Sequence, residues 1–141
     1  MRHNNRNKRK ELRELDTSIQ KTYNKWLPIK DMSRSFFVYK GQYSGSRKEQ
    51  KIHQILKSTN LRFFSEISFD LIKRFDFYIP LLDLVIEYDG KQHFSDLNQI
   101  KNDVAKEAIL KRLGVKLIRY NRTHDLEKQI KHDLIYHEVL Q

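Results

Sequence analysis

Three acidic residues stand at the ends of two short, largely apolar segments in the middle of the chain. Asp76 lies in the first segment, and Glu87 and Asp89 end the second. A turn between the segments would pair them as antiparallel strands, with Ile79 opposite Leu84 and hence Asp76 opposite Glu87. Directly paired residues share a face and side chains alternate along a strand, so this register predicts that the three carboxylates project together.

Carboxylates gathered at the end of an apolar hairpin repel one another and lose hydration unless a cation lies between them. Mg²⁺ is the natural occupant, because it prefers oxygen ligands and usually takes one or two carboxylates, waters and substrate phosphate oxygens. Mn²⁺ is expected to substitute. The alternative is that the acids are exposed strand-end residues paired with nearby lysines and arginines. The apolar run Leu84–Ile86 directly before two of them favours the metal site, with Asp76, Glu87 and Asp89 as ligands.

A histidine and a lysine follow the acids within a few residues. His93 can accept or donate a proton near neutral pH, and Gly90 permits a tight backbone change that would fold it back toward the acids. Such an imidazole suits activation of an attacking water or protonation of a leaving oxygen. Lys91 completes the triplet Asp89-Gly90-Lys91, where its charge could polarise water or hold a phosphate. Both residues are candidates for catalysis, although a lone histidine is more often structural.

Helix and strand patterns alternate from Ser46 to the C-terminus. Ser46 with Glu49 three residues later has the spacing of a capping box and predicts the start of a helix that ends near residue 59. Gly114 predicts the end of a second helix over 97–113, which carries apolar residues at helical spacing. Strands are expected over 61–69, 74–79, 83–89 and 115–120, with a turn over 80–83 and a last helix over 125–140. This order, α-β-β-β-α-β-α, predicts an α/β fold with helices flanking a central mixed sheet of four strands.

Length and charge divide the chain into a basic extension and a nearly balanced body. Its 141 residues suffice for one domain, and 28 Lys and Arg against 18 Asp and Glu give a formal net charge of +10. Residues 1–40 carry a net charge of +7, and residues 41–141 only +3. The turn-forming stretch Gly41–Ser46 therefore predicts a boundary, with an N-terminal extension over 1–45 and a folded domain over 46–141.

A basic extension favours a polyanionic partner, and nucleic acid ahead of an acidic membrane surface. Its first ten residues have no apolar period and are expected to be disordered when free, followed by a short helix over Glu11–Trp26. Trp26 and Phe36 could dock this region on the body or wedge into a base step. The residues expected to contact phosphates are Arg2, Arg6, Lys8, Arg9 and Lys10 of the extension and Lys101 and Lys106 of the helix over 97–113.

Two absences narrow the class of protein. The chain contains no cysteine, which excludes disulfides and cysteine-ligated metal sites and fits a reducing cytoplasm. No apolar run approaches the ~20 residues that a membrane helix needs. We therefore expect a cytoplasmic protein of a bacterial or phage-infected cell, without a membrane partner.

The order of the charged residues resembles the PD-(D/E)xK nuclease superfamily. Asp76 followed by Glu87-Tyr88-Asp89-Gly90-Lys91-Gln92-His93-Phe94 is most similar to the branch of Vsr-like mismatch-repair endonucleases and phage homing endonucleases. The resemblance covers Ser46 to about Tyr120 and implies a restriction-endonuclease-like core over 46–141. The chain departs from the superfamily signature at Phe75, which replaces a proline, and it lacks the zinc-binding Cys/His set of the mismatch-repair members.

The resemblance also implies roles for residues that composition alone would not single out. In that branch a helix before the hairpin carries a glutamate, matched by Glu49, and the next helix carries an aspartate, matched by Asp103. Asp76 matches the metal-binding aspartate, and His93 matches the catalytic histidine. Glu49 could equally be only a helix cap, and Asp103 only part of the solvated face of a lysine-rich helix.

Together these residues predict a Mg²⁺-dependent endonuclease that hydrolyses phosphodiester bonds of DNA, with duplex DNA as the favoured substrate. His93 would transfer protons, Glu49 would orient water or a second metal, and Lys91 would neutralise developing charge. Two alternatives stay open. One is a structure-selective enzyme of the Holliday-junction type, which needs a symmetric homodimer, and the other is a DNA-binding module on an inactive nuclease fold. An RNA target is less favoured.

Overall fold

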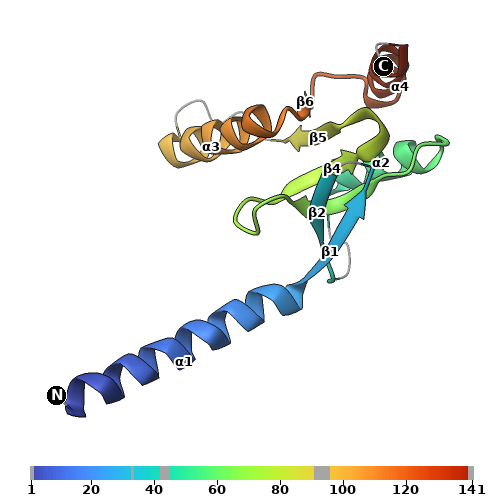
Figure 1. Cartoon of the computed structure of the whole chain (residues 1–141). Helices are drawn as coiled ribbons and strands as arrows, with labels where there is room; N and C mark the ends of the chain where they lie inside the picture. The colour runs from blue at the N-terminus through green and yellow to red at the C-terminus, as the bar shows by residue number, and fades with distance from the viewer. Residues whose placement is uncertain (1, 33, 42–44, 91–95, 140–141) are drawn as a thin grey trace.

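The computed structural model describes residues 2–32, 34–41, 45–90 and 96–139 of the chain. In these ranges six strands form a single sheet in the order β1-β2-β3-β4-β5-β6, accompanied by four α-helices and one 3₁₀ helix (Figure 1). The elements are α1 (Arg2–Lys25), β1 (Trp26–Asp31), β2 (Arg34–Tyr39), α2 (Arg47–Lys57), β3 (Phe64–Ser68), β4 (Phe75–Ile79), η1 (Pro80–Leu82), β5 (Leu84–Asp89), α3 (Leu97–Leu113), β6 (Lys116–Asn121) and α4 (Leu126–Val139).

The sheet is mixed. β1 to β5 are antiparallel neighbours, whereas β6 lies parallel to β5, because the connection through α3 returns the chain to the starting end of β5. An α/β fold with a mixed sheet is therefore confirmed. From α2 onward the order of elements is the predicted one, α-β-β-β-α-β-α.

The predicted number of four strands is wrong, because the described residues add β1 and β2 to the sheet. These two strands form a hairpin that pairs Trp26 with Tyr39 at its open end, and β2 pairs with β3. Trp26 and Phe36 are buried. The tight connection carries Met32 at φ +54°, not the glycine or asparagine that would have marked a hairpin in the sequence. The sheet thus begins inside the segment that was predicted to be an extension.

Residues 2–25 form one helix, α1, where the sequence predicted a disordered arm followed by a short helix from Glu11. The segment contains no glycine or proline, and more than half of its residues are Arg, Lys, Glu, Leu or Gln, which have high helix propensity. α1 leads directly into β1 and projects away from the sheet (Figure 1). None of the helices in the described ranges is long and apolar enough to cross a membrane.

Apolar side chains pack on both faces of the sheet. On one face, Ile52 of α2 and Ile130 of α4 pack in the same core as Phe77 of β4. On the other face, Leu110 of α3 packs in a second core with Val85 of β5. β4 and β5 are therefore enclosed from both sides, which fixes the position of the acidic residues at their ends.

Asp83 ties β2 to the connection between β4 and β5. Its carboxylate accepts hydrogen bonds from Nε and Nη2 of Arg34, at 2.9 and 2.7 Å, and from the hydroxyl of Tyr78 at 2.7 Å. Burial and the hydrogen bond to Asp83 raise the pKa of Tyr78 above its ordinary value. Asp83 also closes η1 with φ +49°, a conformation that aspartate tolerates better than most residues.

Replacing Asp83 by glycine should lower the free energy of unfolding by roughly 2–3 kcal/mol, because Arg34 and Tyr78 lose their shared acceptor while the positive φ stays accessible. Glu127→Ala is the control. Glu127 pairs with Lys131 on the exposed surface of α4, and its loss should cost less than about 0.5 kcal/mol. Urea unfolding followed by circular dichroism gives both values, and equal effects would contradict a structural role for Asp83.

Candidate active site

Side chains from β4, β5 and α3 line a small cavity where the C-terminal end of β5 meets the helix. β4 and β5 pair in the predicted register, with Ile79 opposite Leu84. The cavity has a volume of about 140 Å³. Its lining residues are Asp76, Glu87, Tyr88, Asp89, Gln99, Asp103 and Lys106. The structure therefore brings the three predicted metal ligands to one cavity, and α3 adds Asp103.

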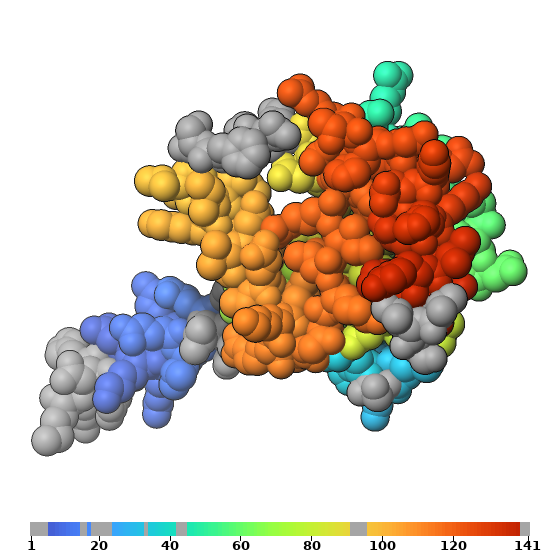
Figure 2. All heavy atoms as spheres, turned by 90° about the horizontal axis from the view of Figure 1, so that it is seen from above, coloured from blue at the N-terminus to red at the C-terminus, as the bar shows by residue number. Residues whose placement is uncertain are grey.

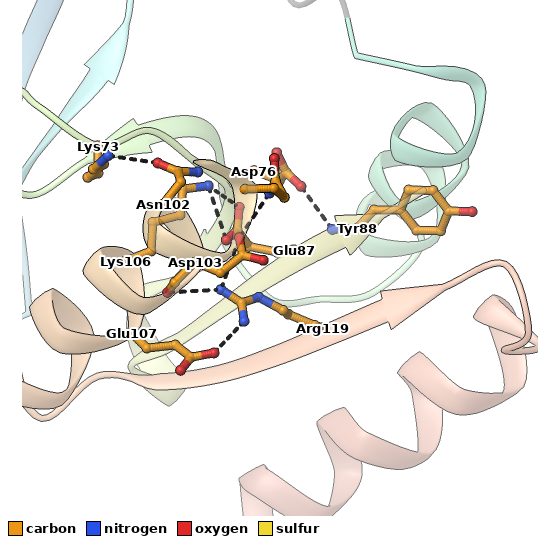
Figure 3. Close-up of polar contacts among 10 residues, drawn as sticks. Lys73, Asp76, Glu87, Tyr88, Asn102, Asp103, Lys106, Glu107 and Arg119 are labelled. Atoms are coloured by element: carbon orange, nitrogen blue, oxygen red, sulfur yellow. Dashed lines mark hydrogen bonds and ion pairs between the residues drawn. The ribbon is translucent and has the colours of Figure 1, made fainter. Parts of the chain in front are cut away.

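Asp76 lies at an irregularity that the sequence did not reveal. β3 and β4 pair on either side of Asp76, but Glu66, between the flanking pairs, has φ +52°. Phe75 and Phe77 are two residues apart and would share a face in a regular strand, yet they belong to the cores on opposite faces of the sheet. The strand thus turns over at Asp76, whose Oδ2 accepts a hydrogen bond of 2.9 Å from the backbone N–H of Tyr88 (Figure 3).

Lys106 reaches from α3 to Glu87. Its Nζ lies 2.9 Å from Oε2 and 3.2 Å from Oε1 of Glu87, and the two side chains are only 15% and 9% exposed (Figure 3). The sequence predicted Lys106 to be a phosphate contact on the helix surface, but the structure places it inside the site. The physical reason is that the buried carboxylate of Glu87 needs a cationic partner, and Lys106 is the cation that α3 presents to it.

A second cation holds α3 against the sheet beside the cavity. Arg119 of β6 forms ion pairs with Asp103, at 3.7 Å, and with Glu107 (Figure 3). Asp103 also accepts a hydrogen bond of 3.0 Å from Nε2 of Gln99. These contacts connect α3 to β6, so they hold Lys106 in place relative to the acids of β4 and β5.

Asp76 and Glu87 are held in an environment that disfavours their charged forms. Burial, the charge of Glu87 and the charge of Glu49 raise the pKa of Asp76 to about 7, although the N–H of Tyr88 and the charge of Lys106 act in the opposite direction. Burial also raises the pKa of Glu87, more than the charge and hydrogen bonds of Lys106 lower it. The positive charge that the protein supplies is therefore too small to keep both carboxylates ionised at neutral pH.

The oxygen donors of the cavity fit Mg²⁺. Across the described part of the chain, no three or more histidine, aspartate or glutamate side chains are already grouped as ligands of one metal ion. Mg²⁺ commonly takes only one or two protein carboxylates, however, and completes its shell with waters and phosphate oxygens. Asp76 and Glu87 supply such a pair on one cavity wall, and a divalent cation would balance the negative charge that Lys106 leaves uncompensated.

The other predicted catalytic residues lie apart from this cavity or outside the described residues. His93 and Lys91 lie outside them, so their roles stay predictions. Glu49 forms the predicted capping box at the start of α2, where Oγ of Ser46 accepts from the N–H of Glu49 and Oε2 of Glu49 accepts from the N–H of Ser46, both at 3.3 Å. Glu49 does not line the cavity, but its charge contributes to the raised pKa of Asp76.

The remaining predicted phosphate contacts lie on two helices. Arg2 begins α1, and the exposed members of the set are Arg6, Lys8, Arg9 and Lys10 on α1 and Lys101 on α3. Gln99, Arg119 and the place of Lys106 inside the site were not predicted from the sequence. The place of Lys106 could have been inferred from the sequence, because Asp103 and Lys106 are three residues apart and must share a face of their helix.

Comparison with known protein families gives a match over about half of the chain. A protein-family model matches residues 66–137, which are 72 of the 141 residues, and the family is described as "Protein of unknown function (DUF2726)". The matched range runs from β3 into α4 and includes every cavity-lining residue among those that the structure describes. No curated protein and no solved structure matches the chain significantly.

The raised pKa of Asp76 predicts how stability depends on pH. The folded protein holds a proton on Asp76 up to about pH 7, whereas the unfolded chain releases it near pH 3.8, so the free energy of unfolding should fall as the pH rises between these values. Asp76→Asn cannot ionise and keeps an acceptor for the N–H of Tyr88. In metal-free buffer this variant should match the wild type near the lower pH and exceed it by on the order of 2 kcal/mol above pH 7.

Thermal or urea unfolding at several pH values measures this difference. Asp70→Asn is the matched control, because Asp70 is exposed and bonds only to groups of its own turn. An Asp76→Asn effect that does not grow with pH would show that Asp76 has an ordinary pKa.

Proposed function

We propose that this chain, which belongs to the family described as "Protein of unknown function (DUF2726)", is a Mg²⁺-dependent endonuclease. It would hydrolyse phosphodiester bonds of DNA. The observation that carries this proposal is the pair of carboxylates, Asp76 and Glu87, on one wall of a cavity at the end of β5. The spacing of these acids resembles the PD-(D/E)xK nucleases. The formal net charge of +10 supports a polyanionic substrate.

In this proposal Asp76 and Glu87 hold the divalent cation, and Asp89 is a further oxygen donor on the same cavity. A cation held there would supply Lewis-acid chemistry to a phosphate oxygen and to the attacking water. Lys106 holds the carboxylate of Glu87 through contacts to both of its oxygens. Asp103 borders the same cavity, where it accepts a hydrogen bond from Gln99.

The proton transfers are assigned to His93, which follows Asp89 by four residues. A neutral imidazole takes a proton from the attacking water, and an imidazolium gives one to the leaving oxygen. Lys91 neutralises charge that develops on the phosphate. Glu49 does not line the cavity, so its contribution in this proposal is the charge that acts on Asp76.

The test is cleavage of supercoiled plasmid by the wild type and by Asp76→Asn. The wild type should nick the plasmid with Mg²⁺ or Mn²⁺ and not with EDTA, and Asp76→Asn should be slower by roughly 10²–10³-fold, because it loses one carboxylate ligand of the cation. The same reaction on linear, mismatched, single-stranded and branched DNA, and on RNA, identifies the preferred substrate.

Asp70→Asn controls for the loss of one acidic residue and should cleave at the wild-type rate. Circular dichroism and DNA binding measured in EDTA should be the same for all three proteins. Cleavage by Asp76→Asn at the wild-type rate, or no cleavage of any substrate by the wild type, would overturn the proposal.

A further inference from the structure

The first half of α1 carries a continuous basic face. Arg6, Arg9, Lys10 and Arg13 have the spacing i, i+3, i+4, i+7, which places them on one side of an α-helix, and all four are exposed. We call these four residues the basic face. With 3.6 residues per turn, Lys8 and Glu11 fall on the opposite side. Arg13 was not among the phosphate contacts predicted from the sequence, and only the helical structure adds it to this set.

α1 stands away from the rest of the fold. It leads straight into β1 and extends from the sheet without lying on either of its faces (Figure 1). Figures 1 and 2 both show α1 and the N-terminal half of α3 extending toward the same side of the molecule, and in Figure 1 the C-terminal end of β5 points to that side too. The proposed active site lies at that end of β5, so a ligand held by α1 would lie on the same side of the molecule as the cavity.

The dimensions and chemistry of α1 suit duplex nucleic acid. A helix of 24 residues is about 36 Å long, and its diameter of about 10–12 Å fits the major groove of a duplex. Arginine pairs with phosphate through two parallel hydrogen bonds, and three of the four residues of the basic face are arginines. An isolated helix is only marginally stable in water, so a polyanion along its basic face would also stabilise it.

The sequence of α1 argues against an acidic membrane surface. A membrane-surface helix buries a wide apolar face opposite its basic face. Residues 2–11, which contain most of the positive charge of α1, include no apolar side chain at all. The basic half of α1 therefore matches an extended row of phosphates better than a lipid bilayer.

We propose that α1 binds the backbone phosphates of duplex nucleic acid through its basic face and so holds the substrate of the adjacent site. The identity of the duplex as a substrate rests on the proposed nuclease function. The binding itself does not, because it depends on the charge, spacing and exposure of α1 alone.

The experiment compares two double variants that remove the same charge. Arg9→Gln with Arg13→Gln takes two residues from the basic face, whereas Lys25→Gln with Lys30→Gln takes two exposed lysines that lie off it and were not predicted to contact phosphate. Binding of a fluorescent duplex is measured by anisotropy in EDTA between about 50 and 200 mM salt. Circular dichroism checks that α1 is equally helical in the three proteins. Truncation to residue 40 is unsuitable, because it would also remove β1 and β2 from the sheet.

The basic-face variant should bind at least about tenfold more weakly near 100 mM salt, and its salt slope should fall by about 2, since each phosphate contact contributes about 0.9 to that slope. The control variant should change affinity by less than about threefold. Equal losses in the two variants, no loss in either, or binding to phosphatidylserine vesicles in preference to the duplex would each overturn the proposal.

Cleavage assays on the same proteins separate this inference from the proposed function. A basic-face effect on binding, without cleavage by any of the proteins, supports the role of α1 and removes the nuclease assignment. Cleavage by the wild type, together with unchanged duplex affinity in the basic-face variant, supports the nuclease assignment and removes the role of α1.

Discussion

The confinement of two carboxylates to one small cavity is the constraint on which the rest of the structure depends. Asp76 and Glu87 belong to neighbouring strands that are packed on both faces, so the acids cannot separate unless the sheet changes. Lys106 compensates part of their charge, and burial still raises the pKa of Asp76 to about 7. The energy of this site is therefore lowest when Asp76 carries a proton or when a further cation is present.

The parallel pairing of β5 with β6 brings Lys106 to these acids. α3 must start near the C-terminal end of β5 and return the chain to the start of β6, so its first turns pass the edge of the sheet where ligands of α/β proteins commonly bind. Arg119 of β6 then holds α3 through Asp103 and Glu107. The family match covers β4, β5, α3 and β6 but not α1, β1 or β2.

Local signals in the sequence predicted much of this structure. The capping box at Ser46, the end of α3 at Gly114 and the register of the β4–β5 hairpin are confirmed, because each depends on a few neighbouring residues. Features that depend on distant partners were missed. The β1–β2 hairpin has no glycine turn, the inversion at Asp76 depends on the backbone of Glu66, and Lys106 is drawn inward by a residue of another strand. Periodicity also overstated the burial of α3, whose Ile100 and Val104 are exposed because only its later turns pack on the sheet.

Calorimetric titration of Mg²⁺ into the metal-free protein tests most directly whether the two carboxylates form a cation site. We predict that the wild type binds the cation near pH 7 with release of a proton, because Asp76 is partly protonated there and must ionise to bind. Asp76→Asn and Glu87→Gln should each weaken binding by at least about tenfold. Wild-type affinity in both variants would contradict a cation site at Asp76 and Glu87, and heat that is independent of the ionisation enthalpy of the buffer would contradict the raised pKa of Asp76.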